Sequence, residues 1–132
     1  MTTREDLLKY ADRRMKEQRK KGLPAFKPIY EIMLFEFPNK KQIIGDQEID
    51  YPNIGAEERP GYFYSVNDAV DAMHKNTLFM SDGIYLAGFV SCKFPGIYDA
   101  IKTDCRFYFK YDPDRRGFYE EEEPEIFHEF AF

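Results

Sequence analysis

The sequence predicts an α+β fold, in which an antiparallel or mixed sheet of about four to six strands carries two main helices. Two stretches repeat apolar residues with the period of an amphipathic helix, and several short stretches are rich in β-branched and aromatic residues. Turn-forming residues separate these stretches. The chain has 132 residues, close to the usual size of one domain, so we expect a single domain over residues 1–132.

The first helix is expected over residues 3–21, at the periphery of the sheet. Thr2 and Glu5 have the spacing of a capping box, and Gly22 and Pro24 favour an end to the helix. The apolar stripe is short, so this helix either docks loosely or meets a second chain. The stripe consists of Leu7, Leu8, Ala11 and Met15.

The first strand is expected over residues 29–37, which are nearly all apolar and rich in strand-forming types. Such a run is typical of a central strand that is buried on both faces. A second short strand is expected over residues 40–44. Residues 45–60 contain several glycines and prolines and are predicted to be a loop, which is often functional when it is this long.

The second helix has the clearest pattern in the chain. A short strand at residues 61–64 precedes Ser65, which is a good N-cap, and Asn76 suits the left-handed conformation that ends many helices. Between them one apolar stripe has helical spacing. It consists of Val66, Ala69, Val70 and Met73.

The remaining residues predict three further strands and an apolar tail. A turn at Pro95 and Gly96 follows the first of these strands, and residues 112–117 form a hairpin turn between the last two. The strands are expected at residues 83–94, 104–111 and 118–121. The tail, residues 124–132, is expected to pack on the domain or on a neighbouring subunit, because it is rich in apolar side chains. These are Ile126, Phe127, Phe130 and Phe132.

Composition narrows the class of protein. The net charge is −5, which disfavours a general nucleic-acid binder and an anionic membrane surface. No apolar run approaches the roughly 18 residues that span a bilayer, and the first residues lack the apolar core of a signal peptide. We therefore expect a cytoplasmic protein that binds no membrane.

Motifs for cofactors and metals are missing from the sequence. There is no phosphate loop, no dinucleotide fingerprint and no HExxH, and the two histidines offer little material for a metal site. Cys92 and Cys105 do not form a CxxC pair. We expect no cofactor and no metal, and we assign no catalytic residue. His74 is open to two interpretations, a general base or, more simply, a half-exposed helical histidine.

The two cysteines are predicted to lie nearly opposite each other on paired strands, as buried thiols. Alternation then gives the core face of the second strand Cys105, Phe107, Phe109 and Tyr111. The other face of this strand pair combines aromatic rings with cations, which can stack a base and hold a phosphate. We predict it as a binding face for a small anionic ligand; the alternative is an ordinary solvated face. Its residues are Tyr85, Ser91, Lys93, Arg106, Tyr108 and Lys110.

The acidic run at residues 120–123 is interpreted as a solvated end, because it lacks the ligand spacing of a calcium loop. Several aromatic and turn motifs lie at residues 61–65, 68–70, 76, 95–98, 107–111 and 122–125. These motifs resemble those of small uncharacterised proteins encoded by Gram-positive gut bacteria, their phages and mobile elements. The resemblance covers residues 29–130 and carries no catalytic residues.

The resemblance implies an accessory protein that binds and blocks another component, including components of host defence. We therefore expect a non-catalytic binding protein whose partner is a protein. The alternatives are a protein that sequesters a small nucleotide-like anion on the Tyr85 to Lys110 face, and a small enzyme that uses carboxylates. The apolar tail and the short stripe of the first helix also predict a homodimer.

Overall fold

The computed structural model describes residues 2–22, 27–36, 39–53, 55, 57–77, 85–94, 105–125 and 127. These residues form an α+β fold of two helices and seven strands, as the sequence predicted. In chain order the elements are α1 (Arg4–Lys20), β1 (Ile29–Phe35), β2 (Asn39–Ile44), β3 (Gln47–Asn53), β4 (Glu57–Phe63), α2 (Val66–Lys75), β5 (Ala87–Lys93), β6 (Arg106–Asp112) and β7 (Gly117–Glu120).

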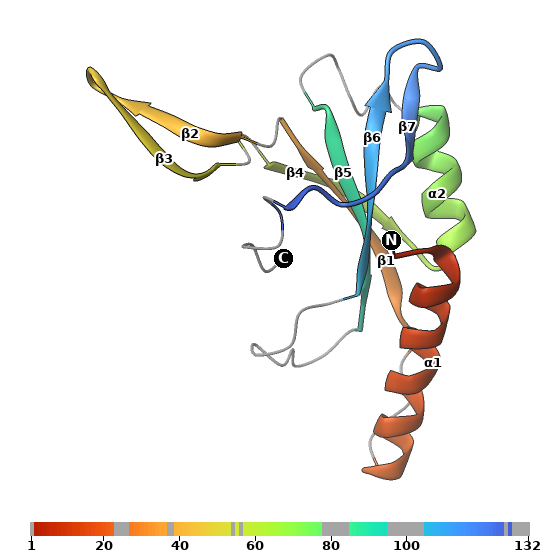
Figure 1. The fold of residues 1–132 in the computed structure, drawn as a ribbon. Helices are drawn as coiled ribbons and strands as arrows, with labels where there is room; N and C mark the ends of the chain where they lie inside the picture. The colour runs from red at the N-terminus through yellow and green to blue at the C-terminus, as the bar shows by residue number, and fades with distance from the viewer. Residues whose placement is uncertain are drawn as a thin grey trace.

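Five of the described strands form one antiparallel sheet in the order β4-β1-β5-β6-β7, and α1 and α2 cover one of its faces (Figure 1). β1 lies between β4 and β5, and residues 32–35 are buried, which confirms the prediction of a central strand. Neither described helix has the length and apolarity that crossing a membrane requires.

The first helix begins one residue later than the capping box predicted. Thr3, not Thr2, is the N-cap: its hydroxyl accepts a hydrogen bond from the backbone N–H of Asp6, whose carboxylate accepts one from the backbone N–H of Thr3. An Asp can close the box as well as the predicted Glu5. Of the predicted stripe, Leu7 and Ala11 are buried, whereas Leu8 is half exposed.

The second helix agrees with its prediction at both ends. The Ser65 hydroxyl accepts a hydrogen bond from the backbone N–H of Asp68, and Asn76 adopts the left-handed conformation with φ 47°. The whole predicted stripe is buried against the sheet.

The prediction of a loop over residues 45–60 is wrong. β3 and β4 occupy most of this range. Gly45 has φ 62° and forms the turn between β2 and β3, a conformation that favours glycine. Pro60 lies in β4, which is an edge strand, beside an irregularity in the β1–β4 register, and edge strands and bulges are the places in a sheet that tolerate proline.

β2 and β3 form a hairpin that pairs with no other strand among those the structure describes. Figure 1 shows this hairpin projecting from the end of the large sheet. We call it the arm, residues 39–53.

Both faces of the large sheet carry a hydrophobic core, because neighbouring residues along each strand alternate between the faces. On the helix side, Cys92 and Cys105 are adjacent as predicted: the Cys92 N–H donates to the Cys105 carbonyl at 3.1 Å. Cys92 is buried, and Cys105 is half-buried. The helix-side core comprises Leu7, Ala11, Tyr30, Ile32, Leu34, Val66, Ala69, Val70, Ala72, Met73, Val90, Cys92, Phe94, Phe107, Phe109 and Phe118.

The opposite face carries a second, smaller core, which we call the open-side core. It comprises Met33, Phe35, Ala87, Phe89, Tyr108 and Phe127. Phe127 is the described residue of the predicted apolar tail that reaches this core. The other tail residues named above, the turn at Pro95 and Gly96, and the predicted strand ends at residues 37, 83, 84 and 104 lie outside the described residues.

Candidate functional site

The structure brings together only part of the predicted ligand face. Arg106 faces Ser91 across the β5–β6 ladder, Tyr108 faces Phe89, and Lys110 faces Ala87. Arg106 and Tyr108 are therefore neighbours on one face. Lys110 is exposed, two residues further along β6 from Tyr108.

Of the two predicted residues on or near β5, Lys93 lies beyond Ser91 on the same face of the strand, whereas Tyr85 lies apart from this pair. Lys93 is half-buried at the far end of β5. Tyr85 precedes β5, which begins at Ala87, and it packs against the helix-side core. A hydrogen bond to Glu58 raises the pKa of Tyr85. The alternation rule failed at Tyr85 because it was applied beyond the end of the strand.

The prediction that this face lies outside the core is wrong. Ser91 and Tyr108 are buried, with exposures of 0% and 4%. Burial, followed by the nearby charges of Glu121 and Glu123, raises the pKa of Tyr108. Within the described residues, the Ser91 hydroxyl oxygen is buried without a hydrogen-bond partner. Strand alternation separated the two faces correctly, but it could not show that residues 121–125 and 127 cover the second one.

Arg106 is the charged centre of this face. Its Nε donates to the Glu123 carboxylate at 2.9 Å, and its Nη2 lies 2.8 Å from the same carboxylate oxygen. Nη2 also donates to the backbone carbonyl of Phe127 at 2.8 Å. The guanidinium lies over the Phe89 ring, 4.7 Å from the ring centre, and the side chain is only 10% exposed. Arg106 thus binds both a carboxylate and a backbone carbonyl in a partly apolar setting, where such contacts are stronger than in water.

The Phe127 ring fills an aromatic pocket beside Arg106. Its centre lies 5.0 Å from that of Phe89, and 5.5 Å from those of Phe35 and Tyr108. Phe127 is fully buried. We call Phe35, Phe89, Arg106 and Tyr108 the Arg106 site, and residues 121–125 and 127 the covering segment.

A surface pocket of about 390 Å³ lies beside the covering segment. It is open to solvent and mostly acidic, with Arg106 as its cation. The lining residues are Thr2, Asp6, Arg106, Phe107, Tyr108, Glu121, Glu122 and Glu123. The pocket gives the Arg106 site a face that reaches solvent even while the covering segment is in place.

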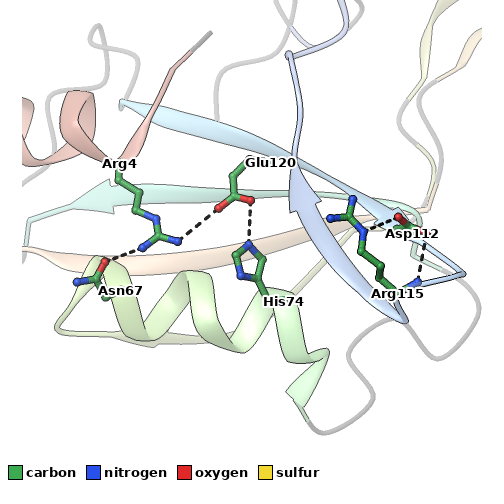
Figure 2. Close-up of polar contacts among 6 residues, drawn as sticks. All are labelled: Arg4, Asn67, His74, Asp112, Arg115 and Glu120. Atoms are coloured by element: carbon green, nitrogen blue, oxygen red, sulfur yellow. Dashed lines mark hydrogen bonds and ion pairs between the residues drawn. The ribbon is translucent and has the colours of Figure 1, made fainter.

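A second polar cluster joins α1, α2 and β7 (Figure 2). His74 Nε2 lies 2.8 Å from a carboxylate oxygen of Glu120, and its ring stacks on Tyr119 at 4.6 Å. Arg4 donates to Asn67 at 2.9 Å and lies 3.6 Å from the other Glu120 oxygen. Burial works against the charge of Glu120, but the His74 hydrogen bond and nearby positive charges outweigh it and lower the pKa of Glu120.

This cluster holds elements together and does not line the pocket beside the covering segment. The His74 side chain is 28% exposed, which agrees with a half-exposed helical histidine. At the far end of β7, Asp112 accepts a hydrogen bond from Arg115 at 2.7 Å (Figure 2). The Arg115 guanidinium also lies over the Tyr119 ring. Within the described residues, no three His, Cys, Asp or Glu side chains are placed to share a metal ion.

The arm is a surface that the sequence analysis missed. Ile43 and Ile44, next to its turn, are 75% and 55% exposed. The sequence did contain a signal, because Gly45-Asp46 between two strand-prone runs is a hairpin turn pattern. The prolines further along the segment obscured it. As consecutive residues of β2, the two isoleucines face opposite sides of the hairpin, so each side exposes one large apolar side chain next to the turn.

Comparison of this chain with protein-family models, with curated proteins and with solved structures found no match. The functional assignment therefore depends on the geometry above.

Proposed function

We propose that this chain is a non-catalytic binding protein that acts by occupying a protein partner, and that the end of the arm contacts that partner. The observation that carries the proposal is the exposure of Ile43 and Ile44 on a projecting hairpin. Burial of one such side chain contributes about 1.5–3 kcal/mol. A partner that covers both isoleucines would therefore gain binding free energy from their burial.

The construction of the arm supports the same proposal. A two-stranded hairpin is only marginally stable in water unless a third strand or another surface completes it. The paired strands β2 and β3 lie apart from the large sheet, so a partner can supply what the rest of the described chain does not.

The charges near the turn indicate the chemistry of the partner. At residues 43–48 the charged side chains are Asp46 and Glu48, and both are acidic. A complementary surface is therefore an apolar cleft bordered by Lys or Arg. A host-defence component, the partner class implied by the resemblance, remains part of this proposal.

The small-anion alternative has less support from the geometry. Tyr85 lies against the helix-side core, Tyr108 is buried, and Arg106 already holds a carboxylate. Arg106→Ala would not separate the two alternatives, because it would disturb the covering segment as well as any ligand.

The arm proposal is tested by comparing three baits in the same host lysate. These are the wild-type chain, the double variant Ile43→Ser/Ile44→Ser, and Leu8→Ser as a matched control. Leu8 is 50% exposed on α1, so the control removes similar apolar surface elsewhere. A protein captured by the wild type and the control, but lost with the arm variant, supports the proposal.

Calorimetry with the purified partner then measures the effect. We expect the arm variant to bind about a hundredfold more weakly, since loss of two buried isoleucines removes about 3 kcal/mol or more. Equal binding by all three proteins would contradict the role of the arm.

A further inference from the structure

The covering segment is held on the Arg106 site in the way that a protein holds a bound peptide. It supplies one charged anchor, the Glu123 carboxylate on Arg106, and one aromatic anchor, the Phe127 ring among three other rings. Phe127 also supplies a backbone carbonyl to Arg106. The Arg106 site thus binds an acidic side chain that lies four residues before an aromatic one.

We infer that the Arg106 site is a peptide-recognition site for a partner protein segment with an acidic residue four positions before an aromatic residue. In this structure the chain's own covering segment occupies the site. The inference concerns a surface separate from the arm, so it stands or falls independently of the proposed function.

The character of the site supports a peptide as its occupant. The Arg106 guanidinium lies over the Phe89 ring, and this contact orients it without any help from the covering segment. Its fork of N–H groups matches a carboxylate, and the neighbouring rings match an aromatic side chain. Buried aromatic and arginine residues are the types that dominate binding energy at protein interfaces.

The covering segment is attached in a way that permits exchange. The last regular strand, β7, ends at Glu120, and residues 121–124 continue without regular structure. Glu121 donates its N–H to the Tyr108 carbonyl, and Glu121 and Glu122 are exposed. The part of the segment beyond Glu121 can therefore leave the site without breaking the ladder between β6 and β7 or the Glu121 hydrogen bond that follows it.

A partner must compete with an attached segment, whose effective concentration is on the order of millimolar. Wild-type protein is therefore expected to bind such a peptide weakly. Substitutions that loosen the covering segment are expected to expose the Arg106 site and to strengthen peptide binding.

The probe is a fluorescent peptide that copies residues 119–128, and binding is measured by anisotropy with the full-length chain. The variant Glu123→Gln/Phe127→Ser is expected to bind it about tenfold or more tightly than the wild type. Adding Arg106→Met is expected to abolish that gain. A control peptide in which Gln and Ser replace the two anchors should bind neither protein.

A second measurement covers the case in which the variant does not fold. A protease site introduced between Glu121 and Glu122 allows the folded full-length protein to be cut in place. Excess copied peptide should then displace the cut segment, while the anchor-free control peptide should not.

Failure of the copied peptide to bind the folded variant, and to displace the cut segment, overturns the inference. Exchange of the segment between copies of this chain is also distinguishable, because light scattering would then show dimers. That result would make a second copy the occupant and would overturn the assignment of a separate partner.

Discussion

The two faces of the large sheet are sealed in different ways. The helix side is covered by α1 and α2, whose buried residues interlock with several strands. The open-side core is covered in the described structure by one irregular segment that contributes a single ring, Phe127. The same strands thus serve two cores, one closed by regular elements and one closed by two anchoring side chains.

This difference separates structural from exchangeable packing. On the helix side, backbone approaches backbone so closely that a methyl group does not fit between α2 and β7. On the open side, the Arg106 side chain holds the Glu123 carboxylate and the Phe127 carbonyl, and these contacts can part without disturbing a hydrogen-bond ladder. Regions of low local stability are the ones that proteins use for binding.

The largest effect is expected from Gly117→Ala, on the helix side. A Cβ at Gly117 would lie 1.8 Å from the His74 carbonyl oxygen and 2.8 Å from its carbon. The strand must therefore move away from α2, at a cost of about 4 kcal/mol or more in the free energy of unfolding. Urea denaturation followed by circular dichroism measures this.

A matched glycine provides the control. Gly61 is also in a strand, but nothing lies within 4 Å of a Cβ added there. Gly61→Ala should leave stability unchanged or raise it by about 0.5 kcal/mol. Similar losses in the two variants would show that the close approach of β7 to α2 is unimportant.

Phe127→Ala is expected to cost less, although it removes a fully buried ring. Truncation of a buried Phe costs about 3–5 kcal/mol, and we expect about 3 here because the covering segment can relax into the space. Hydrogen exchange should show loss of protection in the covering segment while β1 and β5 stay protected. Uniform loss of protection across the sheet would mean that the open side is as integral as the helix side.

The pair Arg106–Glu123 is expected to couple by about 1–2 kcal/mol. A double-mutant cycle of Arg106→Met and Glu123→Gln measures this in urea denaturation. Both partners are partly shielded, at 10% and 27% exposure, so the coupling should exceed that of an exposed pair. Lys16–Asp12, at 65% exposure on both sides, is the matched comparison. Equal coupling in the two pairs would show that the Arg106–Glu123 pair holds the covering segment no more strongly than an exposed ion pair would.

The features that the sequence predicted are local ones. Ser65 and Asn76 bound α2 because capping depends on a few adjacent residues, and β1 is central because its apolar run cannot be placed elsewhere. The register of Cys92 and Cys105 also followed from strand pairing alone. In each case the interaction that decides the outcome lies within the segment or between paired strands.

The features that the sequence did not predict depend on distant contacts. Alternation identifies two faces of β6, but only the folded chain shows that Glu123 and Phe127 return to cover one of them. At Arg106 and Tyr108, the face that was predicted to bind a ligand is in contact with Glu123 and Phe127 of the same chain. The arm was missed for a different reason: Gly45-Asp46 is a turn signal, but it stood among prolines that equally favour a loop.

The smallest effect concerns Glu120, which fastens β7 to α2 and α1 on the helix side. Its pKa in the folded chain lies below the ordinary 4.5, since the His74 bond and nearby positive charges outweigh burial. The ionised carboxylate therefore stabilises the fold fully at pH values above the ordinary pKa of 4.5. This stabilisation is lost as the pH falls through the lower pKa of the folded chain.

Glu120→Gln should consequently be less stable than the wild type near neutral pH by about 0.5 kcal/mol, and the difference should vanish in acid. Urea denaturation at several pH values measures it. Glu122→Gln is the control, because Glu122 is an exposed glutamate of the same acidic run and should show a smaller difference. If the two variants behave alike at every pH, the Glu120 contacts add nothing to the helix side. Its closure would then depend on packing alone, which would widen its contrast with the charge-anchored open side.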